Sequence, residues 1–314
     1  MFSAHSRDTL WVLADRRLSY GPRYPPKDDG VKVMNLHCAD GDGVLAYAGL
    51  GATRRGTQPS DWMSGVLRGH GDKSFEHNLR VLADAATKEL PKHLASIPNP
   101  EQRAHFILAV AFVKGAAGAR VYTIDNFIHP ETGQHWFRYT SHVRSTEPGA
   151  PSPRFAGAGS GAQYVLNKYF RKEEGKAWQR ELLRLLKAHD DGKVPTHRVA
   201  DRLAELNYEV HKALGPNGDV GPRSVVVWCR REGARPNPGS SGHQFYKGDS
   251  RDPADVQIPN IYNGNDLREV IGVIAEPFLQ WFSKGPNQGQ FNPDIDAMNR
   301  ALADIPSTPD EKLR

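Results

Sequence analysis

Two kinds of hydrophobic repeat occur in separate blocks along this chain, and the order of the blocks restricts the fold more than any other feature. Short alternating or continuous apolar segments, typical of strands, lie at residues 9–13, 31–36, 44–48, 105–114, 120–124, 135–143 and 223–231. Segments with helical spacing lie at residues 60–67, 74–90, 161–169, 178–188, 196–214, 266–282 and 294–303. Clusters of strands between paired helices fit α+β layers better than a regular βαβ alternation. A doubly wound nucleotide-binding fold is therefore disfavoured.

Local signals predict how several of these elements begin and end. Ser60–Asp61 resembles a helix cap, and Pro91 is expected to kink or end the second helix. The turn at residues 115–118 predicts a hairpin between the strands on either side of it. Residues 233–259 are rich in Pro, Gly, Ser and Asp, which indicates a linker or a long surface loop.

We therefore expect one main domain over residues 1–232. Residues 233–314 would form a Pro/Gly-rich linker with a helical C-terminal extension.

Composition excludes several classes of protein. No run approaches the roughly 18 apolar residues that a membrane helix needs, and no signal peptide is visible at the start. Two cysteines, Cys38 and Cys229, are too few for a disulfide scaffold. The net charge of +5 is spread along the chain, and Arg-Arg occurs only as isolated pairs without interleaved aromatic residues. We expect a cytoplasmic protein with no metal, no cofactor, no nucleic-acid partner and no membrane partner.

Four stretches carry a resemblance to a known family. They are LADRRLSYG at residues 13–21, DDGVKV at 28–33, GVLAYAGLGATRR at 43–55 and RFAGAGSGAQYV at 154–165. In this order they resemble the proteasome β-subunit family of N-terminal-nucleophile (Ntn) hydrolases. Each motif is weak alone, and together they span roughly residues 9–231. The resemblance implies a four-layer αββα Ntn-hydrolase sandwich followed by the C-terminal extension.

The resemblance also implies a chemistry. In the family, a Thr, Ser or Cys at the mature amino terminus attacks an amide carbonyl, and its own α-amine serves as the base. Matched by motif, Asp15 is the carboxylate that holds a lysine, and Lys32 is that lysine. Gly49 would donate its N–H to the oxyanion, and Ser160 would supply a supporting hydroxyl. Asp219 is a looser match to a second carboxylate, because the family's spacing around it is not reproduced.

The amino terminus departs from the family pattern. Counting back from LADRR places the nucleophile a residue or two before Met1, and Ser3 is displaced from that position by several residues. Two explanations stay open: the chain as given starts after its nucleophile, or the subunit lacks this chemistry. The sequence therefore predicts a threonine-type peptidase subunit if such a nucleophile is exposed, acting on peptide or protein substrates as a homo-oligomer. The alternative is a catalytically inactive structural or regulatory subunit.

Each site residue also has a purely structural interpretation. Asp15 could end a strand and pair with a neighbouring arginine, and Lys32 could point to solvent from an edge strand. Gly49 could serve a turn that needs a positive φ. Ser160 could simply cap the helix that follows it. The glycines around it lack the Lys-Ser/Thr of a phosphate-binding loop.

Overall fold

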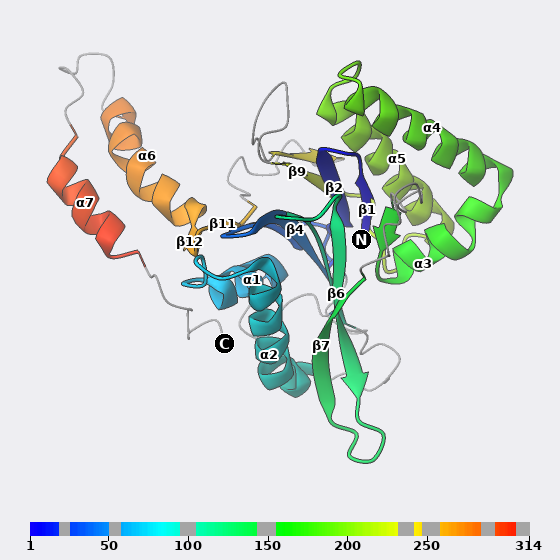
Figure 1. The fold of residues 1–314 in the computed structure, drawn as a ribbon, viewed down its shortest axis with the longest axis horizontal. Coiled ribbons are helices and arrows are strands. Elements are labelled where there is room, and N and C mark those ends of the chain that lie inside the picture. Colours follow the sequence, from blue (N-terminus) through cyan, green and yellow to red (C-terminus); the bar gives the residue numbers. More distant parts are fainter. Residues whose placement is uncertain are drawn as a thin grey trace.

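The structure is a computed structural model that describes residues 1–18, 26–49, 58–94, 105–142, 155–231, 242–246, 258–283 and 293–305. These residues form two β-sheets with helices packed against them (Figure 1). The mixed α+β class predicted from the order of the repeats is confirmed.

The first sheet has five strands, all antiparallel to their neighbours, in the order β10-β9-β2-β1-β8. Its strands are β1 (Phe2–His5), β2 (Thr9–Asp15), β8 (Phe155–Gly157), β9 (Ser224–Arg230) and β10 (Gly242–Tyr246). The chain therefore begins at a strand inside this sheet, between β2 and β8. The register pairs Phe2 with Leu13 and Asp15 with Ser224.

The second sheet has seven strands in the order β12-β11-β3-β4-β5-β6-β7. Its strands are β3 (Val33–Cys38), β4 (Gly41–Ala48), β5 (Phe106–Val113), β6 (Arg120–Ile128), β7 (His135–Ser141), β11 (Asn260–Tyr262) and β12 (Asn265–Asp266). All neighbours are antiparallel except β11 and β3, which pair in parallel with Ile261 opposite Leu36. A segment more than 200 residues later in the chain thus extends the sheet beyond β3.

The helices belong to three groups along the chain. They are α1 (Pro59–Leu67) and α2 (Phe75–Leu94); α3 (Ser160–Asn167), α4 (Glu173–Asp190) and α5 (Thr196–Leu214), with the short 3₁₀ turn Tyr169–Arg171; and α6 (Leu267–Ser283) with α7 (Ile295–Ala303). The third group projects away from the two sheets in Figure 1.

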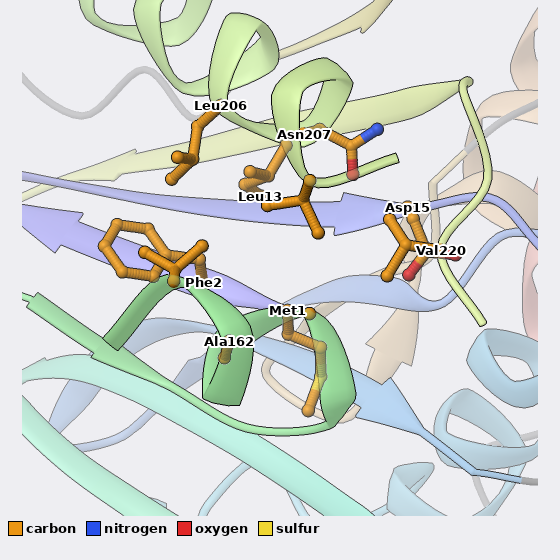
Figure 2. Close-up of a pocket in the computed structure, with 11 residues that line it drawn as sticks. Met1, Phe2, Leu13, Asp15, Ala162, Leu206, Asn207 and Val220 are labelled. Carbon is orange, nitrogen blue, oxygen red and sulfur yellow. The ribbon is translucent and has the colours of Figure 1, made fainter. Parts of the chain in front are cut away.

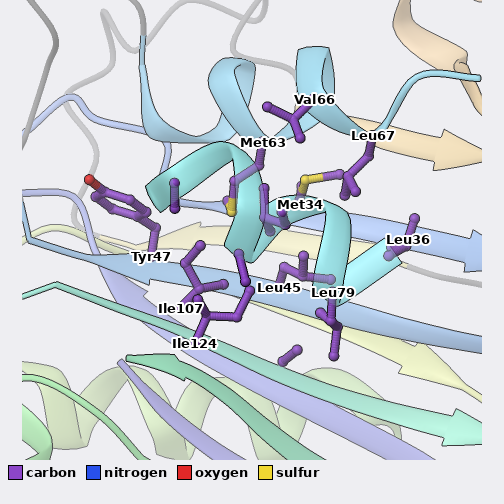
Figure 3. Packing of buried hydrophobic residues seen from close by; sticks show 14 of the residues in the cluster. Met34, Leu36, Leu45, Tyr47, Met63, Val66, Leu67, Leu79, Ile107 and Ile124 are labelled. Atoms are coloured by element: carbon purple, nitrogen blue, oxygen red, sulfur yellow. The ribbon is translucent and has the colours of Figure 1, made fainter. Parts of the chain in front are cut away.

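Strand alternation distributes the apolar side chains among three clusters. On β2, Trp11 and Leu13 pack with residues of α3, α4 and α5, whereas Leu10 and Val12 pack with residues of the seven-stranded sheet. Phe2, Leu13 and Leu206 of the first of these clusters are seen in Figure 2. The third cluster joins the seven-stranded sheet to α1 and α2, and Figure 3 shows its core. One cluster therefore lies between the two sheets, and each of the other two joins one sheet to helices.

The predicted elements agree well with the observed ones, with two corrections at helix ends. The N-cap of α1 is Gln58, followed by Pro59, so the predicted cap at Ser60–Asp61 is wrong. Helix α2 does not end at Pro91 but continues to Leu94, whose side chain is buried against the seven-stranded sheet. This burial outweighs the hydrogen bond that a proline removes near a helix end.

Several short strands, β1, β10 and β11 among them, were not predicted. The prediction of a linker or surface loop over residues 233–259 is wrong for Gly242–Tyr246, which forms β10 against β9, whereas most of that stretch lies outside the described residues. The predicted end of the strand at Val143 also lies outside them. The strand β1 was missed because FSAH is only four residues long, too short for its alternation to stand out, although all four residues are buried.

The cluster between the two sheets should dominate stability. Leu108 on β5 is 1% exposed within it, so Leu108→Ala should lower the free energy of unfolding by about 2–5 kcal/mol. The control is Leu166→Ala on α3, where the side chain is 42% exposed and the change should stay within about 0.5 kcal/mol. Chemical denaturation measures both. Equal losses for the two variants would contradict this view of the core.

Candidate active site

Asp15 and Lys32 form an ion pair beside the first residue of the chain. The Lys32 Nζ atom lies 3.0 Å from Asp15 Oδ1, and the side chains are 10% and 12% exposed. Asp15 ends β2, and Lys32 immediately precedes β3 in the other sheet. The pair therefore links the two sheets, as expected if the lysine is buried with a partner rather than pointing to solvent.

Two arginines that follow Asp15 hold the segment that presents Lys32. The buried Arg16 guanidinium donates to the carbonyl oxygens of Asp29 and Gly30, at 3.0 and 3.3 Å. Gly30 fits tightly here, because a Cβ at this position would lie 2.5 Å from Leu18 Cγ. On the far side of Lys32, its carbonyl accepts the Tyr47 N–H at 2.8 Å. The lysine is thus fixed by backbone contacts on both sides.

Arg17 connects this segment to the loop before β9. Its guanidinium binds both carboxylate oxygens of Asp28, at 2.8 and 3.1 Å, and donates to the carbonyls of Pro216 and Gly218. Its backbone N–H donates to Asp15 Oδ1 at 3.0 Å. The neighbouring arginine therefore contacts Asp15 through the backbone, and its charge is paired with Asp28 instead.

The Met1 amine lies next to the pair. It donates to the Ala158 carbonyl at 3.2 Å, and the Ala158 N–H donates back to the Met1 carbonyl at 3.3 Å. It also interacts electrostatically with both Asp15 and Lys32. Counting residues from LADRR placed the nucleophile position before Met1. The geometry instead puts Met1 itself beside the two charged groups.

Electrostatics separate the roles of the three groups. Burial lowers the pKa of the Met1 amine below its ordinary value of 8.0, and Lys32 adds to this although Asp15 opposes it. Burial disfavours ionisation of Asp15, but the Lys32 ammonium and the Met1 amine together hold the pKa of its carboxyl below 3.8. An amine with a lowered pKa can accept a proton at neutral pH beside a carboxylate that stays ionised.

Gly49 and Ser160 lie on segments that meet next to Met1. Gly49 follows β4 with a φ of +142°, and a Cβ there would lie 2.3 Å from His105 Nδ1, so the position requires glycine on steric grounds. Gly159, just before Ser160, approaches Ala48, because a Cβ on it would lie 3.3 Å from Ala48 Cβ. The exposed Ser160 begins α3, but the N-cap is Gly159 with no side-chain hydrogen bond, so the capping interpretation of Ser160 is wrong.

Asp219 stands at the margin of this group. It is exposed in the loop between α5 and β9, where it interacts electrostatically with Arg17. The next residue, Val220, is buried and lines a cavity of about 20 Å³ together with Met1, Asp15 and Asn207 (Figure 2). A space of this size with polar neighbours has room for one water molecule. Thus Asp15 and Lys32 are in contact beside Met1, Gly49 and Ser160 follow Ala48 and Gly159 where these two residues approach each other, and Asp219 is peripheral.

Sequence reasoning missed the parts that position this site. Arg16 and Arg17 were considered only as partners of the Asp15 carboxylate, and Asn207 was not considered. Asn207 is buried on α5 and donates to the Gly221 carbonyl at 3.0 Å, which fixes the loop after Asp219. A polar residue within the apolar face of the predicted helix over 196–214 was the available signal.

The described residues were compared with two further kinds of feature, a metal site and a membrane-spanning helix, and contain neither. No three His, Cys, Asp or Glu side chains in the described ranges gather closely enough to hold a metal ion. No helix in the part of the chain that the structure describes combines the length and apolar character needed to span a membrane.

The chain has a distant structural likeness to a known protein. No protein-family model matches the chain, and no curated protein matches it. Among solved structures it is similar to Anbu (ancestral beta-subunit) from Yersinia bercovieri, with 12% identity and a TM-score of 0.45 over 92% of this chain and 98% of that one.

The depressed pKa of Asp15 makes its contribution to stability depend on pH. Replacing it with Asn leaves the Lys32 charge buried without its partner, so Asp15→Asn should cost about 3 kcal/mol of unfolding free energy at neutral pH. The difference from wild type should be complete above pH 3.8 and disappear as the pH falls through the lower value of the folded state. Denaturant titrations over this range measure it, with the exposed Asp219→Asn as control. A difference that does not change with pH would contradict the assignment.

Proposed function

We propose that the chain is a proteasome-like subunit with the four-layer αββα sandwich of Ntn hydrolases, and that it hydrolyses amide bonds of peptide substrates. Three apolar clusters support the layered arrangement: α1–α2 against one sheet, sheet against sheet, and the other sheet against α3–α5. We also propose that the main domain ends near residue 232. The strands β10 and β11 come after this boundary in the chain, and each extends one of the two sheets.

The contact between Lys32 and Asp15 beside the first residue is the observation that carries the proposed chemistry. A terminal hydroxyl or thiol at this place would lie near the lysine ammonium, which favours its deprotonated form. The terminal amine, with its lowered pKa, would take the proton. Gly49 directly follows Ala48, the end of β4, which approaches Gly159. We propose that the Gly49 N–H donates a hydrogen bond to the oxyanion and that the Ser160 hydroxyl supports the terminal amine.

A second candidate function is a catalytically inactive structural or regulatory subunit. The side chain beside Lys32 and Asp15 favours this inactive subunit. It belongs to Met1, whose thioether is no nucleophile of this family and packs in the apolar cluster between the sheets. Ser3 does not replace it, since it pairs opposite Val12 and its hydroxyl donates to the Ala156 carbonyl. Two residues along a strand separate Ser3 from Met1 by about 7 Å. We propose a homo-oligomer in the cytoplasm for both functions.

A threonine placed at position 1 should acquire reactivity if Lys32 and Asp15 are catalytic machinery. The variant Met1→Thr, released from a cleavable leader so that Thr is terminal, should form a covalent adduct with a peptide epoxyketone, which needs both the hydroxyl and the free amine. Intact mass spectrometry measures the adduct. The rate should fall at least about 100-fold when Lys32→Met is added, because the charge that stabilises the alkoxide is lost.

The matched control is Met1→Ala released in the same way, which presents the same amine without a hydroxyl and should stay unmodified. A folded Met1→Thr chain that forms no adduct would refute the proposal that Lys32 and Asp15 activate a terminal nucleophile. The intact mass of the protein from its natural source then separates the two functions. A terminal Thr, Ser or Cys with an adduct supports the hydrolase, and a terminal Met1 without one supports the inactive subunit.

A further inference from the structure

Helices α6 and α7 form an arm, defined here as residues 267–283 and 294–304, that projects from the two sheets (Figure 1). The helices pack on each other, and α6 meets the rest of the described chain near β11 and β12. Large apolar side chains on the arm face solvent, with Ile271 53% and Leu279 67% exposed, and Ile274 and Ile295 exposed as well. A helix that is apolar over most of its surface requires cover from another element.

The base of the arm is fixed by a polar network. The Arg268 guanidinium donates to Asp266 and, at 2.7 Å, to Asp61 of α1. Asp266 is buried and accepts the Ser64 hydroxyl at 2.6 Å, and Arg68 pairs with Glu269. These contacts set the direction of α6 relative to α1. The exposed apolar surface is therefore presented in a defined orientation.

The exposed surface of the arm is acidic. Glu276, Asp294, Asp296 and Asp304 are exposed, and Arg300 is the one exposed cation among the arm residues that the structure describes. Asp294 caps α7 by accepting the Ala297 N–H at 2.8 Å. Glu276 and Asp296 lie near the exposed Ile274, Leu279 and Ile295 in sequence, and Asp304 directly follows α7, so the arm presents an apolar surface with an acidic border.

A basic stripe with the complementary pattern runs along α4. We define it as Lys172, Lys176, Arg180, Arg184 and Lys187, all exposed. Their spacing of four, four, four and three residues keeps them on one face of the helix, and the exposed Leu183 lies among them. Lys176 pairs with Glu173 at 2.7 Å, and the other four have no ion-pair partner among the described residues.

We propose that the arm of one copy docks on the basic stripe of a second copy of this chain. The two surfaces have opposite charge, and each has exposed aliphatic side chains that the contact would cover. They lie at opposite ends of the molecule, so an arm does not reach the stripe of its own chain (Figure 1). A contact between two different patches is head-to-tail, and it builds a ring or a filament.

This contact would hold together the homo-oligomer of the proposed function. It does not depend on the chemistry of Asp15 and Lys32. Assembly is measured as mass and chemistry as an adduct, so failure of one is distinguishable from failure of the other. We expect sedimentation velocity of the full chain to give a species heavier than 34.8 kDa, which dissociates as salt screens the charges.

Neutral substitutions test both surfaces separately. The arm variant is Glu276→Gln/Asp296→Asn/Asp304→Asn, and the stripe variant is Lys176→Gln/Arg180→Gln/Arg184→Gln. Each alone should sediment as a monomer. Mixed together, they should form a complex of twice the chain mass and no larger, because the stripe variant retains an intact arm and the arm variant retains an intact stripe. Circular dichroism and denaturation verify that both variants fold.

The matched control is Lys88→Gln/Lys92→Gln/Lys193→Gln, which removes three exposed cations outside the stripe and should assemble as wild type does. A wild-type chain that stays monomeric at its highest soluble concentration would overturn the proposal. So would variants that still assemble alone, or a mixture that gives no one-to-one complex. Assembly of wild type only on addition of an oligonucleotide or anionic vesicles would point to a different partner and would also overturn it.

Discussion

A buried ion pair between Lys32 and Asp15 connects the two sheets at the point where the chain begins. Removing one charge of such a pair leaves the other in a poorly solvated place, at a cost of several kcal/mol. The surrounding backbone must therefore hold Lys32 in reach of Asp15. Arg16 and Arg17 do so from one side, by binding the turn at Asp28–Gly30, and the strand pairing of Tyr47 does so from the other. Positioning in this fold thus depends on residues that carry no role in the proposed reaction.

The same requirement explains why this contact was predictable from the sequence. A lysine within an apolar alternating run needs a partner if it is buried, and an aspartate at the end of a neighbouring strand is a suitable one. The family resemblance supplied the pairing, and the geometry agrees with it at 3.0 Å. The position of Met1 was not predictable by counting. The turn between His5 and Leu10 sets the register of β1, and a turn of another length would move the first residue along β2.

The fold was predictable where a repeat is local and unpredictable where pairing is distant. Helix α5 has the predicted bounds, Thr196–Leu214, because its apolar stripe is strong. The strands β1, β10 and β11 are only three to five residues long, too short for a repeat to identify them, and they form by pairing with β2, β9 and β3. Ser160 illustrates the same limit for a single residue, since its local sequence suggested a helix cap, whereas the N-cap of α3 is Gly159.

The parallel pairing of β11 with β3 has a consequence for synthesis on the ribosome. The strands β3 to β7 are complete once residue 141 has emerged, but the neighbour of β3 is encoded at residues 260–262. Until then the backbone groups along that edge of β3 have no strand beside them, and an open edge invites pairing with another nascent chain. Closing the sheet therefore comes late, and it brings α6 into place at the same time.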